Sequence, residues 1–180
     1  MKILDIGCGN RKHNGAIGID ILKTEQTDIV HDLNKGIPFA SNTFDLIYCS
    51  HILEHLDNVV FIMEEIHRVG KKGGRVIIRV PFFGWSWAFQ DITHKHFFGY
   101  YSFDTFTEIS NPSERFVNYS HVRFRIVRRE IIFSTSSGIT SRILRTLIQP
   151  LANRFPKFYQ RFFAFIIPAE EIYFELSIIK

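Results

Sequence analysis

Cysteine is scarce in this chain, and long apolar runs are absent. Cys8 and Cys49 are the only two cysteines in 180 residues, which excludes a disulfide framework and favours a reduced, cytoplasmic protein. The longest apolar run in the phenylalanine-rich second half, residues 162–167, is far too short to span a bilayer. No signal peptide pattern opens the chain, so no targeting segment is expected ahead of the first strand.

The composition is that of one globular domain with a mildly basic second half. Hydrophobic residues make up 46% of the chain and charged residues 22%, which excludes a disordered chain. The net charge is +4, with most of the excess after residue 120. This excess favours either an anionic partner, such as RNA or a membrane surface, or simply a solvated face.

The first twenty residues indicate a ligand site. Residues 3–6 form a short buried-strand pattern that runs into Gly7 and Gly9, and a second apolar stretch ends at Asp20. Glycines at a strand exit let the backbone approach a ligand closely, because no Cβ blocks it. An acidic residue at the end of the next strand can accept hydrogen bonds from a ribose diol. Together they predict an adenosine-type cofactor at the carboxyl ends of a parallel sheet.

The rest of the first half alternates strands with crossovers, which is typical of a mostly parallel sheet. The helix 58–69 has an apolar stripe at helical spacing, with Asp57 as its expected N-cap and Gly70 as its stop. On its other face Glu64 is expected to pair with Arg68. The strands are expected at residues 2–6, 16–20, 27–31, 44–49 and 74–80.

The first crossover is unusually short. Only about eight residues, 8–15, separate the first two strands, whereas a parallel crossover needs about a dozen. We therefore expect a loop with at most one helical turn. A dinucleotide site requires a third glycine and a full helix to hold a pyrophosphate, but position 12 is lysine, which disfavours a nicotinamide or flavin cofactor.

The second half is richer in aromatics and less regular. A loop over the sheet edge is expected at 81–101, a short helix at 102–109, and strands at 121–134 and 171–179, the last two as an antiparallel edge. Residues 139–167 follow helical spacing, broken by prolines at 150 and 156. Such a segment can be a core helix, a lid, a membrane contact or a dimer interface.

Five motifs in order resemble those of class I S-adenosylmethionine-dependent methyltransferases, and most closely the small "type 11" members. They are LDIGCG (4–9), HDLN (31–34), FDLIY (44–48), HILEHL (51–56) and EIHRVGKKGG (65–74). The resemblance implies a Rossmann-like α/β fold. Its seven-stranded, mostly parallel sheet has the order 3-2-1-4-5-7-6, with strand 7 antiparallel and helices on both faces. One domain, 1–180, would comprise a cofactor-binding half (1–81) and a substrate-side half (82–180).

The resemblance also implies S-adenosyl-L-methionine as cofactor and assigns its contacts. Gly7 and Gly9 would pass under the methionine and ribose portions, and Asp5 would orient the turn and reach the methionine amino group. Asp20 would hold the ribose hydroxyls. The remaining contacts would be Ile21 on the adenine, Asp32 and Leu33 at its border, and Ser50 and His51 at the methionine end. Position 11 departs from the family, since arginine replaces a small residue and is free to pair with the methionine carboxylate.

Residues 91–98 are the candidate catalytic segment. They resemble an Asp-Pro-Thr-His-Lys stretch of this subgroup, with Ile92 in place of the proline. His94 is the candidate general base and Asp91 the residue that orients it, although both side chains also fit a loop held by hydrogen bonds to backbone. A metal site from Asp91, His94 and His96 lacks a fourth ligand, so no metal is expected. His55 is expected to be a structural residue at the helix start.

These observations predict an enzyme that transfers a methyl group to oxygen or nitrogen of a small molecule, a sugar or a lipid-linked acceptor. Nucleic acid is disfavoured, because the basic residues are interspersed with phenylalanine rather than clustered. Peripheral membrane contact stays open. The alternatives are a silent binding module, motivated by Arg11 and the short crossover, and an RNA methyltransferase that uses the basic second half.

Overall fold

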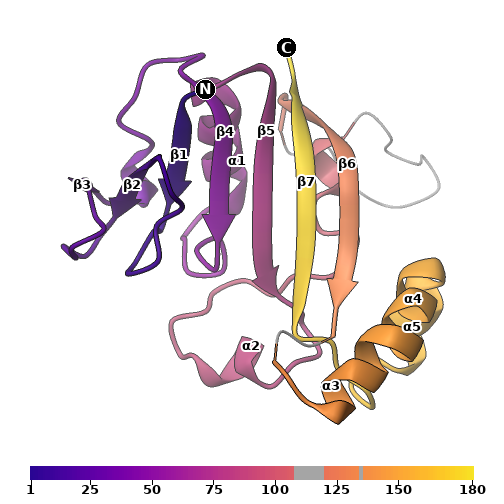
Figure 1. Ribbon diagram of the computed structural model, residues 1–180. Coiled ribbons are helices and arrows are strands. Elements are labelled where there is room, and N and C mark those ends of the chain that lie inside the picture. The colour runs from indigo at the N-terminus through magenta and orange to yellow at the C-terminus, as the bar shows by residue number, and fades with distance from the viewer. Residues whose placement is uncertain (108–119, 134–135) are drawn as a thin grey trace.

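The computed structural model describes residues 1–107, 120–133 and 136–180. Seven strands form one sheet in the order β3-β2-β1-β4-β5-β7-β6, and β7 is antiparallel to both of its neighbours (Figure 1). This confirms the expected sheet. The strands are β1 (Ile3–Ile6), β2 (Ala16–Asp20), β3 (Ile29–Val30), β4 (Phe44–Ser50), β5 (Gly70–Pro81), β6 (Arg123–Ile132) and β7 (Glu171–Ile179).

Helix α1 (Val59–Val69) begins one residue later than expected. Its N-cap is Asn58, whose side chain accepts a hydrogen bond from the backbone N–H of Phe61, so the prediction of Asp57 was wrong. Asn and Asp are similarly good N-caps, and the pattern could not choose between neighbours. Asp57 is instead free to bind the Lys95 ammonium at 2.6 Å.

The ion pair on the polar face of α1 differs from the predicted one. Arg68 pairs with Glu65 at 2.6 Å, not with Glu64, which accepts a hydrogen bond from the Ser120 hydroxyl. The expected pair was wrong because Glu65 also accepts the N–H of Ile37 and lies where the Arg68 fork can reach it. Gly70 ends the helix as expected and starts β5 directly.

One face of the sheet is covered by α1 and by phenylalanines of residues 98–106. The side chains of Phe98, Phe103, Phe106, Phe124 and Phe174 are nearly or fully buried and pack against one another in stacked and edge-to-face pairs. Much of the phenylalanine excess therefore forms the core between β5, β7, β6 and this segment. The expected helix at 102–109 is only a 3₁₀ turn, η2 (Asp104–Phe106), and its last two positions lie outside the described residues.

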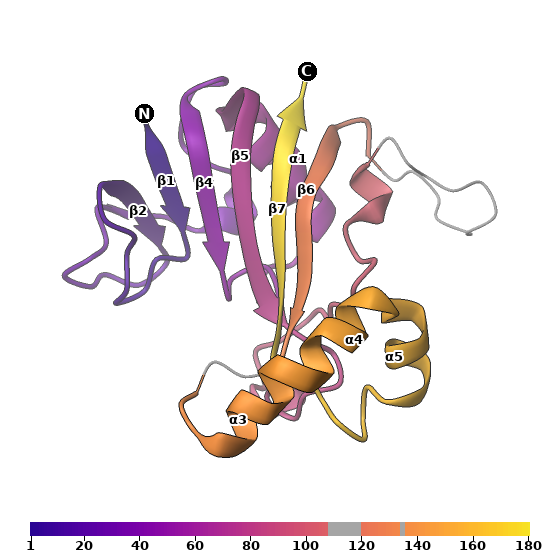
Figure 2. The same ribbon diagram turned by 45° about the vertical axis from the view of Figure 1, so that its right-hand side comes forward.

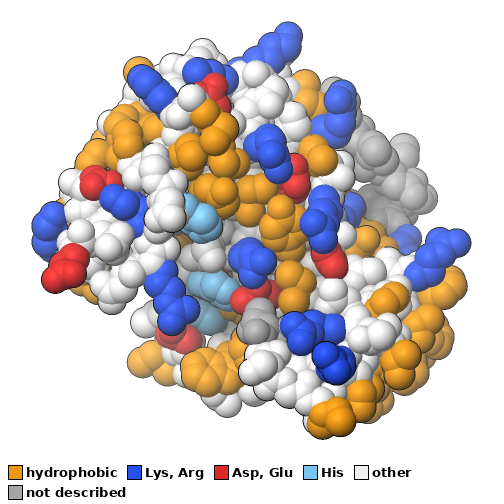
Figure 3. Space-filling view, in the orientation of Figure 1, with side chains coloured by type: hydrophobic (Ala, Val, Ile, Leu, Met, Phe, Trp, Pro, Cys, Tyr) orange, Lys and Arg blue, Asp and Glu red, His pale blue; other side chains and the backbone are white. Residues whose placement is uncertain are grey.

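The opposite face carries no helix in the described part of the chain, so the helical cover on both faces implied by the resemblance is met on one face only (Figures 1 and 2). Between β1 and β2 the chain forms turns alone, confirming the short crossover. Charged and polar side chains lie on the exposed strands of this face instead. Arg75 pairs with Glu175 at 2.6 Å, and Arg79 and Arg128 lie over the Tyr173 ring, so basic and acidic side chains are interspersed on this face (Figure 3).

The segment 139–167 is helical up to Phe162, continues as turns, and lies at the end of the sheet where the parallel strands terminate (Figure 1). Pro150 and Pro156 each lie in the first turn of a helix, where the missing N–H is tolerated, and the helical run is interrupted only at Phe155, directly before Pro156. No helix in the described residues is long and apolar enough to span a membrane. The short helices are α2 (Trp87–Gln90), α3 (Ile139–Ile143), η3 (Leu144–Ile148), α4 (Gln149–Arg154) and α5 (Pro156–Phe162).

Candidate functional site

A cavity of about 350 Å³ lies at the carboxyl ends of β1 and β4. In open α/β sheets this edge is where ligands bind. Five of the nine residues predicted to hold the cofactor line it, together with four that were not in that set. The lining is Asp5, Gly7, Cys8, Gly9, Asn10, Arg11, His13, Ser50 and His51.

Glycine occupies the two positions of the turn for different structural reasons. Both have positive φ, 69° for Gly7 and 48° for Gly9, a region that other residues enter only with strain. A Cβ on Gly7 would lie 2.6 Å from the side chain of Ile52, so this glycine is required by packing. A Cβ on Gly9 would meet no atom within 4 Å. Gly9 therefore leaves open space beside the cavity, as a ligand cradle requires.

Asp20 ends β2 and binds the glycine turn. Its carboxylate accepts the backbone N–H groups of Gly9 and Leu22, both at 2.9 Å. An ionised carboxylate has about four acceptor sites, so capacity remains for a diol. The next side chain, Ile21, is 64% exposed, and neither Asp20 nor Ile21 is among the residues that line the cavity, so their contacts with the cofactor stay predictions.

Asp5 holds the shortened crossover in place. Its carboxylate, 2% exposed, accepts the backbone N–H of His13 at 2.8 Å and contacts the His13 ring Nδ1 at 2.9 Å. That ring stacks on Tyr48 with centroids 3.6 Å apart. Asp5 thus orients the crossover loop at His13. Its predicted roles, orienting the glycine turn and contacting a methionine amino group, stay predictions.

Asp32 and Leu33 lie beyond the cavity lining. The Asp32 side chain caps the 3₁₀ turn η1 (Leu33–Lys35) by accepting the N–H of Asn34 at 3.0 Å. Leu33 is 4% exposed and packs in the core. A border to the adenine at these two residues stays a prediction.

His51 carries the main charged network of the site. Its Nε2 lies 3.1 Å from Glu171 and its Nδ1 lies 3.4 Å from Glu54, and these carboxylates raise the pKa of His51 to about 9. Glu171 also binds Arg79 at 3.1 Å. At neutral pH the wall of the cavity therefore holds an imidazolium. Its backbone φ of 52° is unusual for a non-glycine residue and typical of functional sites.

The candidate catalytic residues lie beside this network. His94 is held by the backbone, since its Nδ1 lies 2.9 Å from the carbonyl oxygen of Ala88. Asp91 does not hydrogen-bond to it, because the Asp91 carboxylate is 3.9 Å from His94 Nε2. Asp91 instead accepts the Thr93 hydroxyl at 2.6 Å, and the Thr93 oxygen contacts His55 Nδ1 at 2.8 Å.

The histidines do not group as the sequence suggested. His96 binds the carbonyl oxygen of Leu56 through its Nε2. It therefore does not join Asp91 and His94 in the metal site considered from the sequence. Glu54, His55 and His94 come together instead, with one ligand atom of each within 4.8 Å of the others. Sequence reasoning missed Glu54, although it lies inside the HILEHL motif.

This sheet order, with a glycine turn after β1 and a carboxylate ending β2, defines a Rossmann-like protein of the class that binds nucleoside-type cofactors. Residues 4–78 match the model of the methyltransferase domain family. This match covers less than half of the chain, and it agrees with the resemblance to the class I methyltransferases that use S-adenosyl-L-methionine as cofactor.

Individual proteins are similar to part of the chain in sequence or to most of it in fold. An uncharacterised protein of Methanocaldococcus jannaschii is 33% identical over 91 residues, 43% of this chain and 40% of that protein. The chain thus spans less than half the length of the curated relatives it matches. A putative methyltransferase from Bacillus halodurans has the same fold, with a TM-score of 0.64 at 14% identity over 99% of this chain and 93% of that one. A SAM-dependent methyltransferase from Archaeoglobus fulgidus gives 0.55 at 15% identity, over 98% and 85%.

Proposed function

We propose that the chain transfers a methyl group from S-adenosyl-L-methionine to an oxygen or nitrogen atom of an acceptor. One observation carries the proposal: the cavity at the ends of β1 and β4 opens at Gly9, where a side chain would point into empty space. The residues fit the cofactor without a phosphate-binding helix, because this cofactor has no phosphate. Arg11 lines the same cavity and supplies a cation for the methionine carboxylate.

When bound, the cofactor supplies a methyl group on a positively charged sulfur. The residues of the chain hold and orient the reactants, which is a large part of what an in-line displacement requires. Asp20 would accept hydrogen bonds from the ribose diol, and Gly7 and Gly9 would bring backbone against the ligand. An acceptor hydroxyl must lose its proton to the solvent as the new bond to carbon forms. His94 is the residue through which we propose that this proton leaves.

The acceptor is proposed to be borne by a lipid. No acidic residue occurs between Glu130 and Glu170, and this stretch contains five Lys and Arg residues. The structure folds it into short helices with exposed apolar side chains, among them Phe158 (58%) and Phe162 (53%), around an apolar cavity of about 300 Å³. An apolar face flanked by cations is typical of helices that bind anionic membrane surfaces.

A vesicle-binding experiment tests the lipid proposal. The chain should sediment with vesicles of phosphatidylcholine mixed with phosphatidylglycerol, and more weakly with phosphatidylcholine alone. The double variant Phe158→Ser and Phe162→Ser should lose most of this binding. Val30→Ser removes a similarly exposed apolar side chain (52%) from the distant strand β3 and should bind like the unmodified chain. Equal vesicle binding by the double variant and by Val30→Ser would refute the proposal that this apolar face binds lipid.

A turnover experiment tests the reaction itself. Radiolabelled S-adenosylmethionine is incubated with the chain and a total lipid extract, and the label is followed into the organic phase. We expect S-adenosylhomocysteine to form in proportion to the transferred label, and His94→Ala to reduce this transfer with little change in cofactor affinity. Cofactor binding without turnover on lipid, sugar or small-molecule extracts would instead favour a silent binding module.

A further inference from the structure

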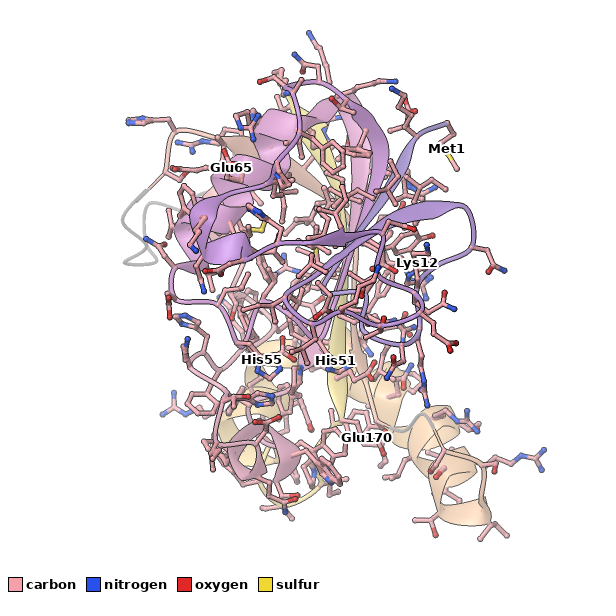
Figure 4. All side chains as sticks on the ribbon, turned by 90° about the vertical axis from the view of Figure 1, so that its left-hand side faces the viewer. Met1, Lys12, His51, His55, Glu65 and Glu170 are labelled. Atoms are coloured by element: carbon pink, nitrogen blue, oxygen red, sulfur yellow. The ribbon has the colours of Figure 1, made fainter. Side chains whose placement is uncertain are left out.

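Three side chains with Lewis-base atoms converge beside the cofactor cavity. Glu54 and His55 lie just after β4, and His94 lies in the loop after β5. Figure 4 shows His55 next to His51, at the same end of the sheet as the cavity. One ligand atom of each of the three residues lies within 4.8 Å of the other two.

The hydrogen-bond network determines which nitrogen of each ring is free. A threonine hydroxyl has one hydrogen, and Thr93 gives it to the Asp91 carboxylate at 2.6 Å, which can only accept. The Thr93 oxygen must therefore accept from His55, so His55 carries its proton on Nδ1. His94 likewise donates from Nδ1 to the carbonyl oxygen of Ala88. In each ring the nitrogen left to bind an ion is therefore Nε2.

The third member is a buried carboxylate that lacks hydrogen bonds. Glu54 is 1% exposed, and neither of its carboxylate oxygens has a hydrogen-bond partner among the described residues. Its nearest cation is His51, whose Nδ1 lies 3.4 Å from Oε1, an ion-pair distance without a hydrogen bond. Such a carboxylate is costly to bury, so a cation beside it would be strongly stabilising.

We propose that Glu54, His55 and His94 bind one divalent transition-metal ion. Two imidazole nitrogens and a carboxylate suit ions such as Zn²⁺, Mn²⁺ and Fe²⁺, and three protein ligands leave a position open. Metal–nitrogen bonds of about 2 Å place tetrahedral ligand atoms about 3.3 Å apart. Rotation of the three side chains therefore has to bring the atoms closer than the 4.8 Å found here.

The surrounding contacts fit this assignment. Metal-binding histidines generally donate their second ring nitrogen to a carbonyl or a polar group, which orients the ring. The Ala88 carbonyl does this for His94, and the Thr93 hydroxyl does it for His55. Asp91 in turn fixes Thr93, so the stretch Asp91-x-Thr93-His94 acts as one unit: a ligand, an orienting hydroxyl and the carboxylate that positions it.

The role of the ion rests on the proposed function. An acceptor hydroxyl at the open position would have a lower pKa and would release its proton to water more readily. With its Nε2 bound to the ion, His94 would act on the acceptor by holding the ion rather than by taking the proton, and Asp91 and Thr93 are positioning residues.

Metal titration of the purified chain, stripped with a chelator, tests the site without any cofactor. Titration with Zn²⁺ followed by calorimetry should show one site per chain, and Co²⁺ should give the visible absorption band of a low-symmetry nitrogen–oxygen site. His94→Ala and His55→Ala should each weaken Zn²⁺ binding by about 10–100-fold or more. His121→Ala, which removes an exposed histidine elsewhere, should bind Zn²⁺ like the unmodified chain.

A positioning variant and a second ligand keep the result interpretable. Thr93→Val removes only the hydroxyl that orients His55, so it should weaken Zn²⁺ binding by about 10-fold while the melting temperature stays near that of the unmodified chain. Equal Zn²⁺ affinity in the unmodified chain and in His94→Ala would overturn the inference. S-adenosylhomocysteine is titrated separately: its binding without Zn²⁺ binding refutes only the metal site, and Zn²⁺ binding alone refutes only the proposed function.

Discussion

Replacing Gly9 with alanine tests whether the cavity is the cofactor site. Gly9 and Gly15 both have positive φ, 48° and 74°, and a Cβ on either would meet no atom within 4 Å. Alanine at either position therefore costs about 1–2 kcal/mol of backbone strain, and neither variant gains a clash within the protein. Only Gly9 lines the cavity. Gly15→Ala is thus a matched control for the strain.

The two variants should differ in ligand binding. An added methyl group in a closely packed contact costs about 1–3 kcal/mol, which is about a 5–150-fold loss of affinity. Calorimetry with S-adenosylhomocysteine should show this loss for Gly9→Ala, while Gly15→Ala binds like the unmodified chain. Thermal unfolding should show similar destabilisation of both. If both variants bound the ligand with equal affinity, the cofactor would not lie against Gly9 and the reasoning would be refuted.

Substitutions of Asp20 and Phe174 and a change of pH at His51 test three other parts of the structure. Asp20→Ala should weaken S-adenosylhomocysteine binding by about 1–3 kcal/mol in calorimetry, and unchanged affinity would exclude a ribose contact. The pKa of His51 is raised to about 9, so its ion pairs stabilise the fold fully below pH 6.5 and the effect is lost as the pH rises through 9. Because the side chain is 40% exposed, we expect a loss of only about 1–2 kcal/mol, seen in urea unfolding at several pH values and absent in His51→Gln. Phe174→Ala should destabilise the core by about 3–5 kcal/mol in the same assay, whereas Phe89→Ala, 55% exposed, should cost far less.

The fold was largely predictable from local patterns. Residues 16–20 and 171–179 are strands with the expected bounds, because apolar side chains there recur at strand spacing between clear breaks. Strand β5 starts at Gly70, four residues before the expected start, because Gly70 pairs with Phe44 across the sheet. Pairing partners of this kind are set by register and leave no local signal.

The missing helices on one face also follow from chain length. Residues 8–15 are too few for a crossover helix, and that much was visible in the sequence. What replaces the helices was not visible, because the pairing of Arg75 with Glu175 depends on the antiparallel register of β5 and β7. The strand expected at 121–134 is β6 (Arg123–Ile132), and residue 134 lies outside the described residues.

The glycine turn that lines the cavity was visible in the sequence, but the network of side chains around it was not. The glycine turn and Asp20 stood out because a strand exit needs special backbone. The contact between His51 and Glu171 joins residues 120 positions apart and exists only because β7 runs back against β5. In the same way, Glu54 and His55 meet His94 only when the loops after β4 and β5 lie side by side.

Calorimetry of the unmodified chain with S-adenosylmethionine and S-adenosylhomocysteine, with NAD as a control, tests directly whether the chain binds the proposed cofactor. We expect micromolar binding of the two sulfur ligands at one site per chain and no binding of NAD. Binding of NAD, or no binding of either sulfur ligand, would contradict it.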